Sequence, residues 1–179
     1  MVETIASESI YKGRVFEVRL DTIREGDSEY KREIVVHKGS AVVVPVFDDQ
    51  TVALVLQYRH PCGKYLLEIP AGGVEDGETY EMAALRELEE EIGYKAGKIE
   101  KLTEFYVSPG FLTEKMYLYL ATELTEASQN LDEDEILSIK RLTFPQALRH
   151  IRQGDIEDAK TIVGLMLTAA KFGFAFETI

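Results

Sequence analysis

Three glutamates that lie close together, Glu87, Glu90 and Glu91, are the residues of this chain best suited to chemistry. On an ideal helix, at about 100° per residue, all three fall on one face. Carboxylates at this spacing repel one another, and a hard cation that prefers oxygen ligands, such as Mg²⁺, would offset the repulsion. The spacing therefore suggests a divalent-metal site, although an ordinary Glu-rich surface helix explains it equally well.

Two features next to the glutamates favour the metal site. Gly72 and Gly73 precede the helix, and glycine lets the backbone approach a ligand closely, which places backbone carbonyls near the carboxylates. Arg86 lies beside Glu87 and can pair with carboxylates and hold their rotamers in position.

The helix that must carry these residues is predicted over residues 79–92, which are rich in strong helix formers. Gly93 is a typical C-terminal stop. Apolar residues form a separate stripe that can pack in a core: Ala84, Leu85, Leu88 and Ile92. The predicted helix therefore combines an anchoring face with a carboxylate face.

The remaining elements mix strands and helices without a regular βαβ alternation. The strands at 41–47 and 51–59 are predicted to pair as a hairpin, and Pro45 favours an edge or a bulge for the first of them. Residues 123–135 form an expected solvated loop. Further strands are expected at 65–69, 101–107, 115–121 and 137–142, and helices at 144–153 and 156–171. This order favours an α+β sandwich over a doubly wound sheet.

Composition limits the functional classes. The chain has 179 residues, with 20 Lys plus Arg against 32 Asp plus Glu and a formal net charge of -12, which disfavours sequence-independent binding to nucleic acid. No apolar stretch approaches the roughly 20 residues that span a bilayer, and no secretory signal is visible. The single cysteine, Cys62, excludes an internal disulfide. We expect a soluble cytoplasmic protein without nucleic-acid or membrane partners.

A longer pattern surrounds the glutamates, G-x5-E-x7-R-E-U-x-E-E-x-G-U, the signature of Nudix hydrolases. The chain matches it at every fixed position, with a less usual tyrosine in the last apolar position: Gly72, Glu78, Arg86, Glu87, Leu88, Glu90, Glu91, Gly93 and Tyr94. The resemblance implies an α/β/α sandwich with a mixed sheet, the Nudix fold. It also implies that water attacks phosphorus in a nucleoside diphosphate linked to another group. Two or more Mg²⁺ ions, or Mn²⁺ as a substitute, would assist at each site.

The resemblance also implies roles for single residues, position by position. Glu87 and Glu91 would be the principal metal ligands, with Glu90 assisting. Ala71, just before the signature glycine, would offer a backbone carbonyl as a further ligand, and Arg86 would orient the carboxylates.

Motifs outside the signature resemble the ADP-ribose pyrophosphatase branch of this family: 57–59 (QYR), 67–72 (LEIPAG), 108–114 (SPGFLTE) and 158–161 (DAKT). They imply that ADP-ribose is split into AMP and ribose 5-phosphate. Another nucleoside diphosphate sugar, such as ADP-glucose or GDP-mannose, stays open as the substrate, because the flanking loops choose the groups on either side of the diphosphate. A non-catalytic ligand-sensing module is disfavoured, since the signature carboxylates are all present.

In that branch a loop glutamate after S-P-G acts as the catalytic base or holds the attacking water, and the corresponding residue here is Glu114. Closure of such a loop can bring a carboxylate over the diphosphate and exclude bulk water. Glu90 is the competing candidate for the base, and a solvated loop glutamate is the alternative without a catalytic role. Gly110 and Phe111 of the same loop are candidate substrate contacts.

Four further residues are candidates for binding the substrate. Arg59 ends a strand, where its guanidinium can pair bidentately with phosphate, and a surface ion pair is the alternative. Glu68 could accept hydrogen bonds from a ribose or an adenine amine, but a structural ion pair explains it equally well. Family members bind adenine partly through the N-terminal strands of the second subunit, and either Lys31 or Arg32 could fill the matching basic position.

Residues 1–37 are a predicted β meander that is too small to bury its own apolar face. We expect it to pack on the main body or on a second subunit. Exposed strand edges favour a homodimer, and the resemblance implies that the N-terminal strands swap between subunits. The predicted domains are therefore residues 1–37, for dimerisation and substrate-side contacts, and residues 38–179, the Nudix hydrolase domain.

Overall fold

The computed structural model describes residues 1–131 and 136–175 and divides into two compact units. The first unit contains Met1–Gly39 and Phe105–Met116. The second contains Ser40–Glu104 and the described residues from Tyr117 onward. A segment far along the chain, 105–116, therefore belongs to the same unit as the N-terminal strands.

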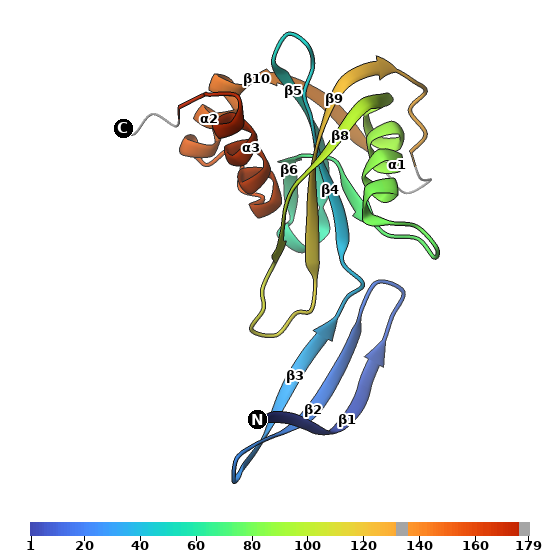
Figure 1. The fold of residues 1–179 in the computed structure, drawn as a ribbon, viewed down its shortest axis with the longest axis vertical. Helices are drawn as coiled ribbons and strands as arrows, with labels where there is room; N and C mark the ends of the chain where they lie inside the picture. Colours follow the sequence, from blue (N-terminus) through green and yellow to red (C-terminus); the bar gives the residue numbers. More distant parts are fainter. Residues whose placement is uncertain (132–135, 176–179) are drawn as a thin grey trace. The chain divides into compact units, whose positions relative to one another are not determined.

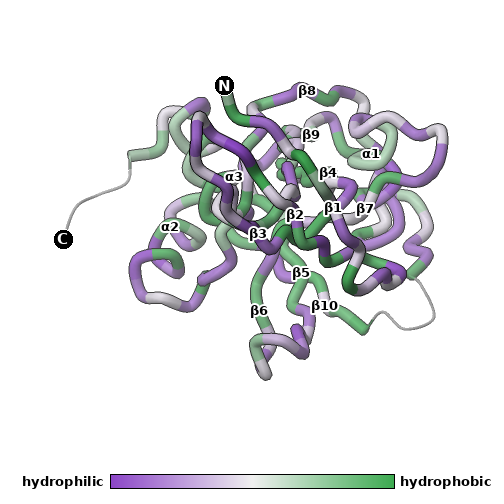
Figure 2. Tube along the Cα trace, turned by 90° about the horizontal axis from the view of Figure 1, so that it is seen from below, coloured by the Kyte–Doolittle hydropathy of each residue, from purple (hydrophilic) through white to green (hydrophobic). Residues whose placement is uncertain are grey.

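The first unit is built on an antiparallel sheet in the order β1-β2-β3. Its strands are β1 (Val2–Lys12), β2 (Glu17–Glu25) and β3 (Ser28–Val36). The turn between β2 and β3 is tight, and Gly26 takes a φ of 59° there, which glycine adopts without strain. Hydrophobic and hydrophilic residues intermix along the three strands (Figure 2), and Val2, Ile10 and Tyr11 of β1 are exposed.

Two sheets form the centre of the second unit, one ordered β10-β5-β6 and the other β7-β4-β9-β8. The strands of the first are β5 (Thr51–Arg59), β6 (Lys64–Glu68) and β10 (Leu137–Thr143), with the short helix η1 (His60–Cys62) between β5 and β6. The strands of the second are β4 (Ser40–Pro45), β7 (Ala71–Gly73), β8 (Tyr94–Tyr106) and β9 (Lys115–Glu126).

Helices cover both sides of these strands. Helix α1 (Tyr80–Ile92) lies on one side, and α2 (Phe144–Gln153) and α3 (Ala159–Lys171) lie on the other (Figure 1). This arrangement confirms the predicted α+β sandwich. None of the helices in the described part of the chain is long and apolar enough to span a membrane.

The core of the second unit is centred on β4, whose residues are all buried. Ala83, Ala84 and Leu88 of α1 are buried in the same cluster as Val43 of β4. On the other side, a Cβ at Gly164 of α3 would come within 2.7 Å of Ile69, so glycine at this position allows α3 to approach the sheet closely.

Two predictions about the strands are wrong. Strand β4 lies between β7 and β9 rather than at an edge, because Pro45 is the last residue of the strand and interrupts no ladder inside it. The hairpin predicted from the strands at 41–47 and 51–59 does not form a ladder, because β5 pairs with β10 and β6. In the described residues the two segments meet near their turn, through an isolated bridge between Val46 and Val52 and a hydrogen bond from the Phe47 amide to the Thr51 carbonyl.

Other boundaries shift by a few residues. Helix α3 begins at Ala159 rather than at residue 156, because the side chain of Asp158 caps it by accepting a hydrogen bond from the Thr161 amide. Strand β9 runs to Glu126, so the predicted loop at 123–135 is partly strand. Residues 132–135 of that loop lie outside the described residues.

Candidate active site

Helix α1 forms where its sequence places the start and stop signals. The Thr79 side chain accepts a hydrogen bond from the Met82 amide at 3.2 Å, and Gly93 ends the helix with a φ of 71° and an amide bonded to the Glu89 carbonyl. These are an ordinary N-cap and a glycine C-cap. The helix predicted over residues 79–92 is confirmed to within one residue.

The carboxylate face of α1 is turned toward the protein. Glu87 is 8% exposed and Glu91 is 2% exposed, while the Glu90 side chain is 30% exposed. Burying a charged carboxylate is costly unless it is paired. An ordinary Glu-rich surface helix is therefore a poor account of this helix, since its glutamates would face solvent.

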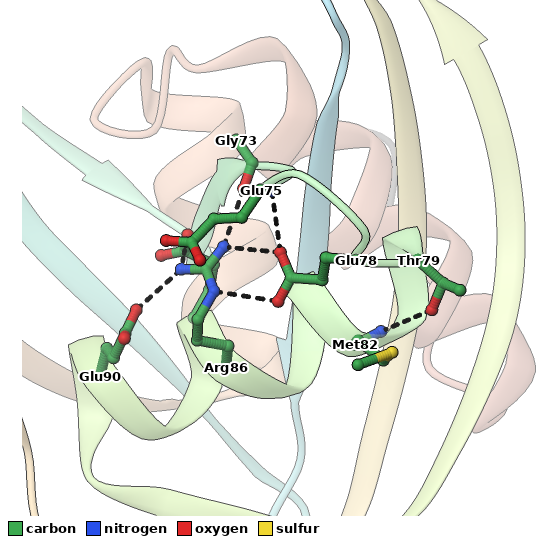
Figure 3. A network of polar contacts seen from close by, with 8 residues as sticks. Gly73, Glu75, Glu78, Thr79, Met82, Arg86 and Glu90 are labelled. Carbon is green, nitrogen blue, oxygen red and sulfur yellow. Dashed lines mark hydrogen bonds and ion pairs between the residues drawn. The ribbon is translucent and has the colours of Figure 1, made fainter.

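Arg86 supplies much of the compensating charge. Its guanidinium donates to Glu87 Oε1 at 2.7 Å, to Glu90 Oε2 at 2.8 Å and to the Gly73 carbonyl at 2.8 Å. It also pairs with both carboxylate oxygens of Glu78, at 3.0 and 3.2 Å (Figure 3). Arg86 therefore holds two glutamates of α1 and the loop that precedes the helix in one arrangement.

The ion pairs of Arg86 shift the pKa values of Arg86 and of Glu78. Burial acts to lower the pKa of Arg86, but Glu78, Glu87 and Glu90 raise it well above its ordinary value. The hydrogen bonds from Arg86 lower the pKa of Glu78. Glu78 belongs to the signature, and sequence reasoning gave it no role, although its fixed spacing from Arg86 was the available signal.

Gly72 explains how Glu87 reaches the backbone of β7. A Cβ built on Gly72 would overlap the Glu87 carboxylate, whereas a Cβ on Gly73 would meet no heavy atom of the described residues within 4 Å. The Glu87 carboxylate therefore lies directly against the backbone of β7, the strand that begins with Ala71. Of the two glycines, only Gly72 is required for this close approach.

The donor set of this face fits a hard divalent cation, since carboxylate and carbonyl oxygens are the ligands that such ions prefer. Glu87, Glu90, Glu91 and the backbone at Ala71 would supply them. Within residues 1–131 and 136–175, no three acidic, histidine or cysteine side chains already form a group that could hold a metal ion. In this arrangement the Arg86 guanidinium pairs with both Glu87 and Glu90.

A pocket of about 450 Å³ lies beside α1. Its lining includes Arg86 and Glu90, and the other lining residues are Leu85, Glu89, Lys95, Ala96, Ser128 and Asn130. The chain after β9 forms one wall, because the Asn130 amide donates to the Glu90 carbonyl at 3.2 Å and Gln129 Nε2 donates to the Glu91 carbonyl at 2.6 Å. A segment predicted as solvated loop is thus bonded to the end of α1.

Arg59 and Glu68 form an ion pair in the second unit. The Arg59 guanidinium donates to both Glu68 oxygens, at 2.7 and 2.8 Å. The Glu68 side chain is 2% exposed and that of Arg59 is 38% exposed. Glu68 raises the pKa of Arg59, and the charge of Glu91 on α1 adds to that effect. Arg59 therefore lies within electrostatic reach of the carboxylate face of α1.

A buried lysine that the sequence analysis did not single out as a site residue completes this pair. Lys160 Nζ pairs with Glu68 and, at 3.0 Å, with Asp158. Burial alone would raise the pKa of Glu68, but the hydrogen bonds and charges of Arg59 and Lys160 bring it below its ordinary value. The motif at 158–161 was the signal in the sequence.

The remaining predicted residues belong to the first unit. The loop at 108–114 bonds to β3, because Val35 donates to the Phe111 carbonyl at 2.8 Å and Thr113 donates to the Val35 carbonyl at 2.9 Å. Glu114 Oε1 lies 3.6 Å from His37 Nδ1. Gly110 and Phe111 are exposed in this loop.

Lys31 and Arg32 lie on β3, opposite Thr22 and Asp21 of β2. The Arg32 guanidinium stacks on the Tyr30 ring at 4.2 Å. The structure therefore groups the predicted residues as two sets: Lys31, Arg32, Gly110, Phe111 and Glu114 in the first unit, and Arg59, Glu68, Ala71, Arg86, Glu87, Glu90 and Glu91 in the second.

Comparison with known proteins gives consistent results. A model of the NUDIX domain matches residues 37–163. The chain is 40% identical over 172 residues to an ADP-ribose pyrophosphatase of Bacillus subtilis, covering 94% of this chain and 93% of that protein. It is also 40% identical over 166 residues to a methanol dehydrogenase activator of Bacillus methanolicus, covering 91% and 90%.

Two further similarities are more distant. The chain is 36% identical over 146 residues to a GDP-mannose pyrophosphatase of Cronobacter sakazakii, covering 75% of each. A crystal structure of an ADP compounds hydrolase superposes with a TM-score of 0.85 at 23% identity, covering 96% of this chain and 94% of that one. At this identity the superposition shows a shared fold.

Proposed function

This chain belongs to the NUDIX family, and from that premise we propose that it hydrolyses the diphosphate bond of ADP-ribose to give AMP and ribose 5-phosphate. The observation that carries the proposal is the buried carboxylate face of α1, anchored by Arg86 and pressed against the backbone of β7. The similarity to the Bacillus subtilis ADP-ribose pyrophosphatase supports the choice of substrate.

The proposed reaction needs positive charge at the diphosphate, which bound divalent metal ions would supply. Two or more Mg²⁺ ions, with Mn²⁺ as a substitute, would neutralise the diphosphate and lower the pKa of a bound water. Glu87 and Glu91 would be the principal ligands, Glu90 would assist, and the Ala71 carbonyl would complete the set. Their oxygen donors support this assignment.

The chain's own residues would hold the substrate around that centre. Arg86 fixes the rotamers of Glu87 and Glu90 through the hydrogen bonds described above. Arg59 would bind the diphosphate, since its side chain is 38% exposed while Glu68 holds its Nε and one terminal nitrogen, and Glu68 would orient Arg59 or meet the ribose. Lys31 or Arg32 would contact the adenine end, and Gly110 and Phe111 would cover the substrate.

Glu114 is the proposed base, acting from the loop at 108–114, and Glu90 is its competitor. We expect Glu114→Gln to lower kcat strongly with a modest change in KM, because a base acts in the transition state rather than in binding. Steady-state kinetics would decide. A variant that changes only KM would move the base elsewhere, with Glu90 as the next candidate.

A GDP-mannose pyrophosphatase also resembles this chain, so hydrolysis of another nucleoside diphosphate sugar is the second candidate. The experiment is a substrate panel with Mg²⁺, comprising ADP-ribose, ADP-glucose and GDP-mannose, with the products separated by chromatography. Preference for ADP-ribose with AMP as product supports the proposal. Preference for another sugar nucleotide would keep the diphosphate chemistry and overturn the substrate.

We also propose a homodimer that exchanges its N-terminal strands, and a cytoplasmic location. The exposed apolar residues of β1, which include Val2, Ile10 and Tyr11, support the dimer.

A further inference from the structure

Lys160 lies at a place where lysine is unusual. Its side chain is 7% exposed, and lysine is almost never buried without a partner. Its ammonium group meets Glu68 at the end of β6 and Asp158 at the N-cap of α3. Two acidic partners from different elements therefore converge on one buried cation.

The contacts of Glu68 form a chain that leads to Arg59. Glu68 Oε2 accepts from both Lys160 Nζ and the Arg59 guanidinium, and Glu68 Oε1 accepts from Arg59 Nε. A carboxylate held by a buried lysine on one side has little freedom to rotate. The orientation of its two oxygens toward Arg59 is then fixed. The partly exposed guanidinium, which donates to both oxygens, is fixed with them.

The start of α3, which carries Lys160, is also held in place by hydrogen bonds. Thr161, fully buried, donates its hydroxyl to Asp158 at 2.5 Å, and the Ile69 amide donates to the same hydroxyl at 2.9 Å. These bonds tie the first turn of α3 to the residue that follows Glu68 in the chain. The first turn of α3, which carries Lys160, is therefore hydrogen-bonded to the chain immediately after β6.

We propose that Lys160 is a positioning residue for substrate binding, which acts through Glu68 to hold the Arg59 guanidinium in the orientation that receives the diphosphate. This inference rests on the proposed function, because it assumes that Arg59 contacts the substrate. Lys160 itself lies behind Glu68 and reaches no substrate atom in the mechanism given above.

The test is a double-mutant cycle. Lys160→Met keeps most of the length of the unbranched side chain and removes its charge, and Arg59→Lys removes the two parallel hydrogen bonds that a guanidinium can donate to Glu68. We expect Lys160→Met to raise KM for the hydrolysed nucleotide by about tenfold, the size associated with one hydrogen bond to a charged group. We expect kcat to stay within about twofold, since the chemical step is untouched.

In the Arg59→Lys background, Lys160→Met should raise KM by less than about twofold. Glu68 then has no guanidinium to orient, so the loss of Lys160 can no longer act on substrate binding through it. A purely structural role would give the same change in both backgrounds. Additive effects, or a fall in kcat without a rise in KM, would therefore overturn the proposal.

The matched control is Lys64→Met. Lys64 also joins β6 to the chain just before α3, through Glu157, but its side chain is 49% exposed. Its backbone lies opposite Arg59 in the pairing of β5 with β6, while its ammonium group pairs with Glu157 and that of Lys160 pairs with Glu68. We expect its KM to equal that of the wild type. A KM raised as much as in Lys160→Met would show that any lost link between these elements suffices, and would overturn the proposal.

Folding is followed by thermal unfolding of each variant. If Lys160→Met unfolds at the assay temperature, Lys160→Gln, which can still donate to Glu68, replaces it in the cycle. If both variants unfold, Lys160 serves the fold and the positioning role is overturned. Failure of the wild type to cleave any member of the substrate panel would instead refute the proposed function.

Discussion

Arg86 meets three glutamates and one backbone carbonyl with a side chain that is 24% exposed. Hydrogen bonds between charged groups are stronger and more directional than neutral ones, so this single residue sets the rotamers of Glu87 and Glu90. The Glu87 carboxylate is confined from the other side by the backbone at Gly72. The geometry of the candidate site thus depends on the Arg86 guanidinium and on the absence of a side chain at Gly72.

Replacing Gly72 by alanine tests that geometry. The new Cβ would overlap the Glu87 carboxylate, so the carboxylate must move, and we expect kcat to fall by about 100-fold, as for a misplacement of about 1 Å in an active site. Steady-state kinetics gives the comparison. Gly73→Ala is the control, since its Cβ meets no described heavy atom within 4 Å, and equal losses in the two variants would contradict this account.

Glu91→Gln tests the proposed metal site. The amide keeps the shape of the side chain but loses the charge, and we expect turnover at saturating Mg²⁺ to fall by about 100-fold or more, because the charge neutralisation supplied by metal is worth several kcal/mol. Turnover is measured over a Mg²⁺ titration. Glu89→Gln serves as the control, because Glu89 lies on the same helix and pairs with Lys95 of β8 at 3.2 Å. Near-normal turnover of Glu91→Gln would refute the metal assignment.

The spacing of the signature was sufficient to predict that these glutamates share one face of a helix. It could not predict that Arg86 would reach back to the Gly73 carbonyl, because that contact depends on the path of the loop between β7 and α1. Sequence periodicity describes a helix face, while the contacts of one side chain depend on the rotamer and on neighbouring backbone.

At the scale of elements, α3 is attached to β5 and β6 by charge as well as by packing. Glu68 is buried between two cations, one from β5 and one from α3. Removing one partner of a buried ion pair leaves the other charge buried without compensation. The free energy lost is therefore larger than the net stabilisation that the pair provided. The stability of this junction should therefore depend on the charge of Glu68.

Glu68→Gln should lower the free energy of unfolding by about 3–5 kcal/mol near neutral pH. Arg59 and Lys160 hold the pKa of Glu68 below its ordinary value in the folded protein. A group with a depressed pKa stabilises the fold above its unfolded pKa, about 4.3 for glutamate, and loses that contribution as the pH falls further. The gap between wild type and variant should be constant above about pH 5.5 and should narrow below about pH 4.3.

Denaturant unfolding at several pH values measures this gap. Glu157→Gln is the matched control, because Glu157 forms an exposed pair with Lys64, and exposed pairs contribute about 0–1 kcal/mol. A gap that stays constant down to pH 3, or that is no larger than in Glu157→Gln, would show that the buried pair does not stabilise the fold through its charge.

The elements themselves were partly predictable. Helix α1 followed from its helix formers and caps, and α2 begins and ends at the predicted residues. The pairing of β4 was not predictable in the same way, because strand partners that are distant in sequence, such as β4 with β9, leave no local signal. Pro45 was misleading because it is the last residue of β4, where its missing N–H interrupts no ladder inside the strand.

At the scale of the whole molecule, charge and apolar surface act in opposite directions. The formal net charge of -12 makes two copies of the chain repel each other. The exposed apolar residues of β1, such as Ile10, which is 57% exposed, favour burial against another chain. Replacing Ile10 by lysine should therefore weaken the proposed dimer, whereas Ile139→Lys, on the exposed side of β10, should not.

The opposition of charge and apolar surface makes the salt dependence of dimerisation diagnostic. The Debye length falls from about 30 Å at about 0.01 M ionic strength to about 3 Å at about 1 M. Salt therefore screens repulsion between the two acidic chains while it leaves apolar burial intact or strengthens it. We expect the dimer dissociation constant, measured by sedimentation equilibrium, to fall as NaCl is raised across this range. A dissociation constant that rises with salt would mean that complementary charges, rather than the apolar residues of β1, hold the subunits together.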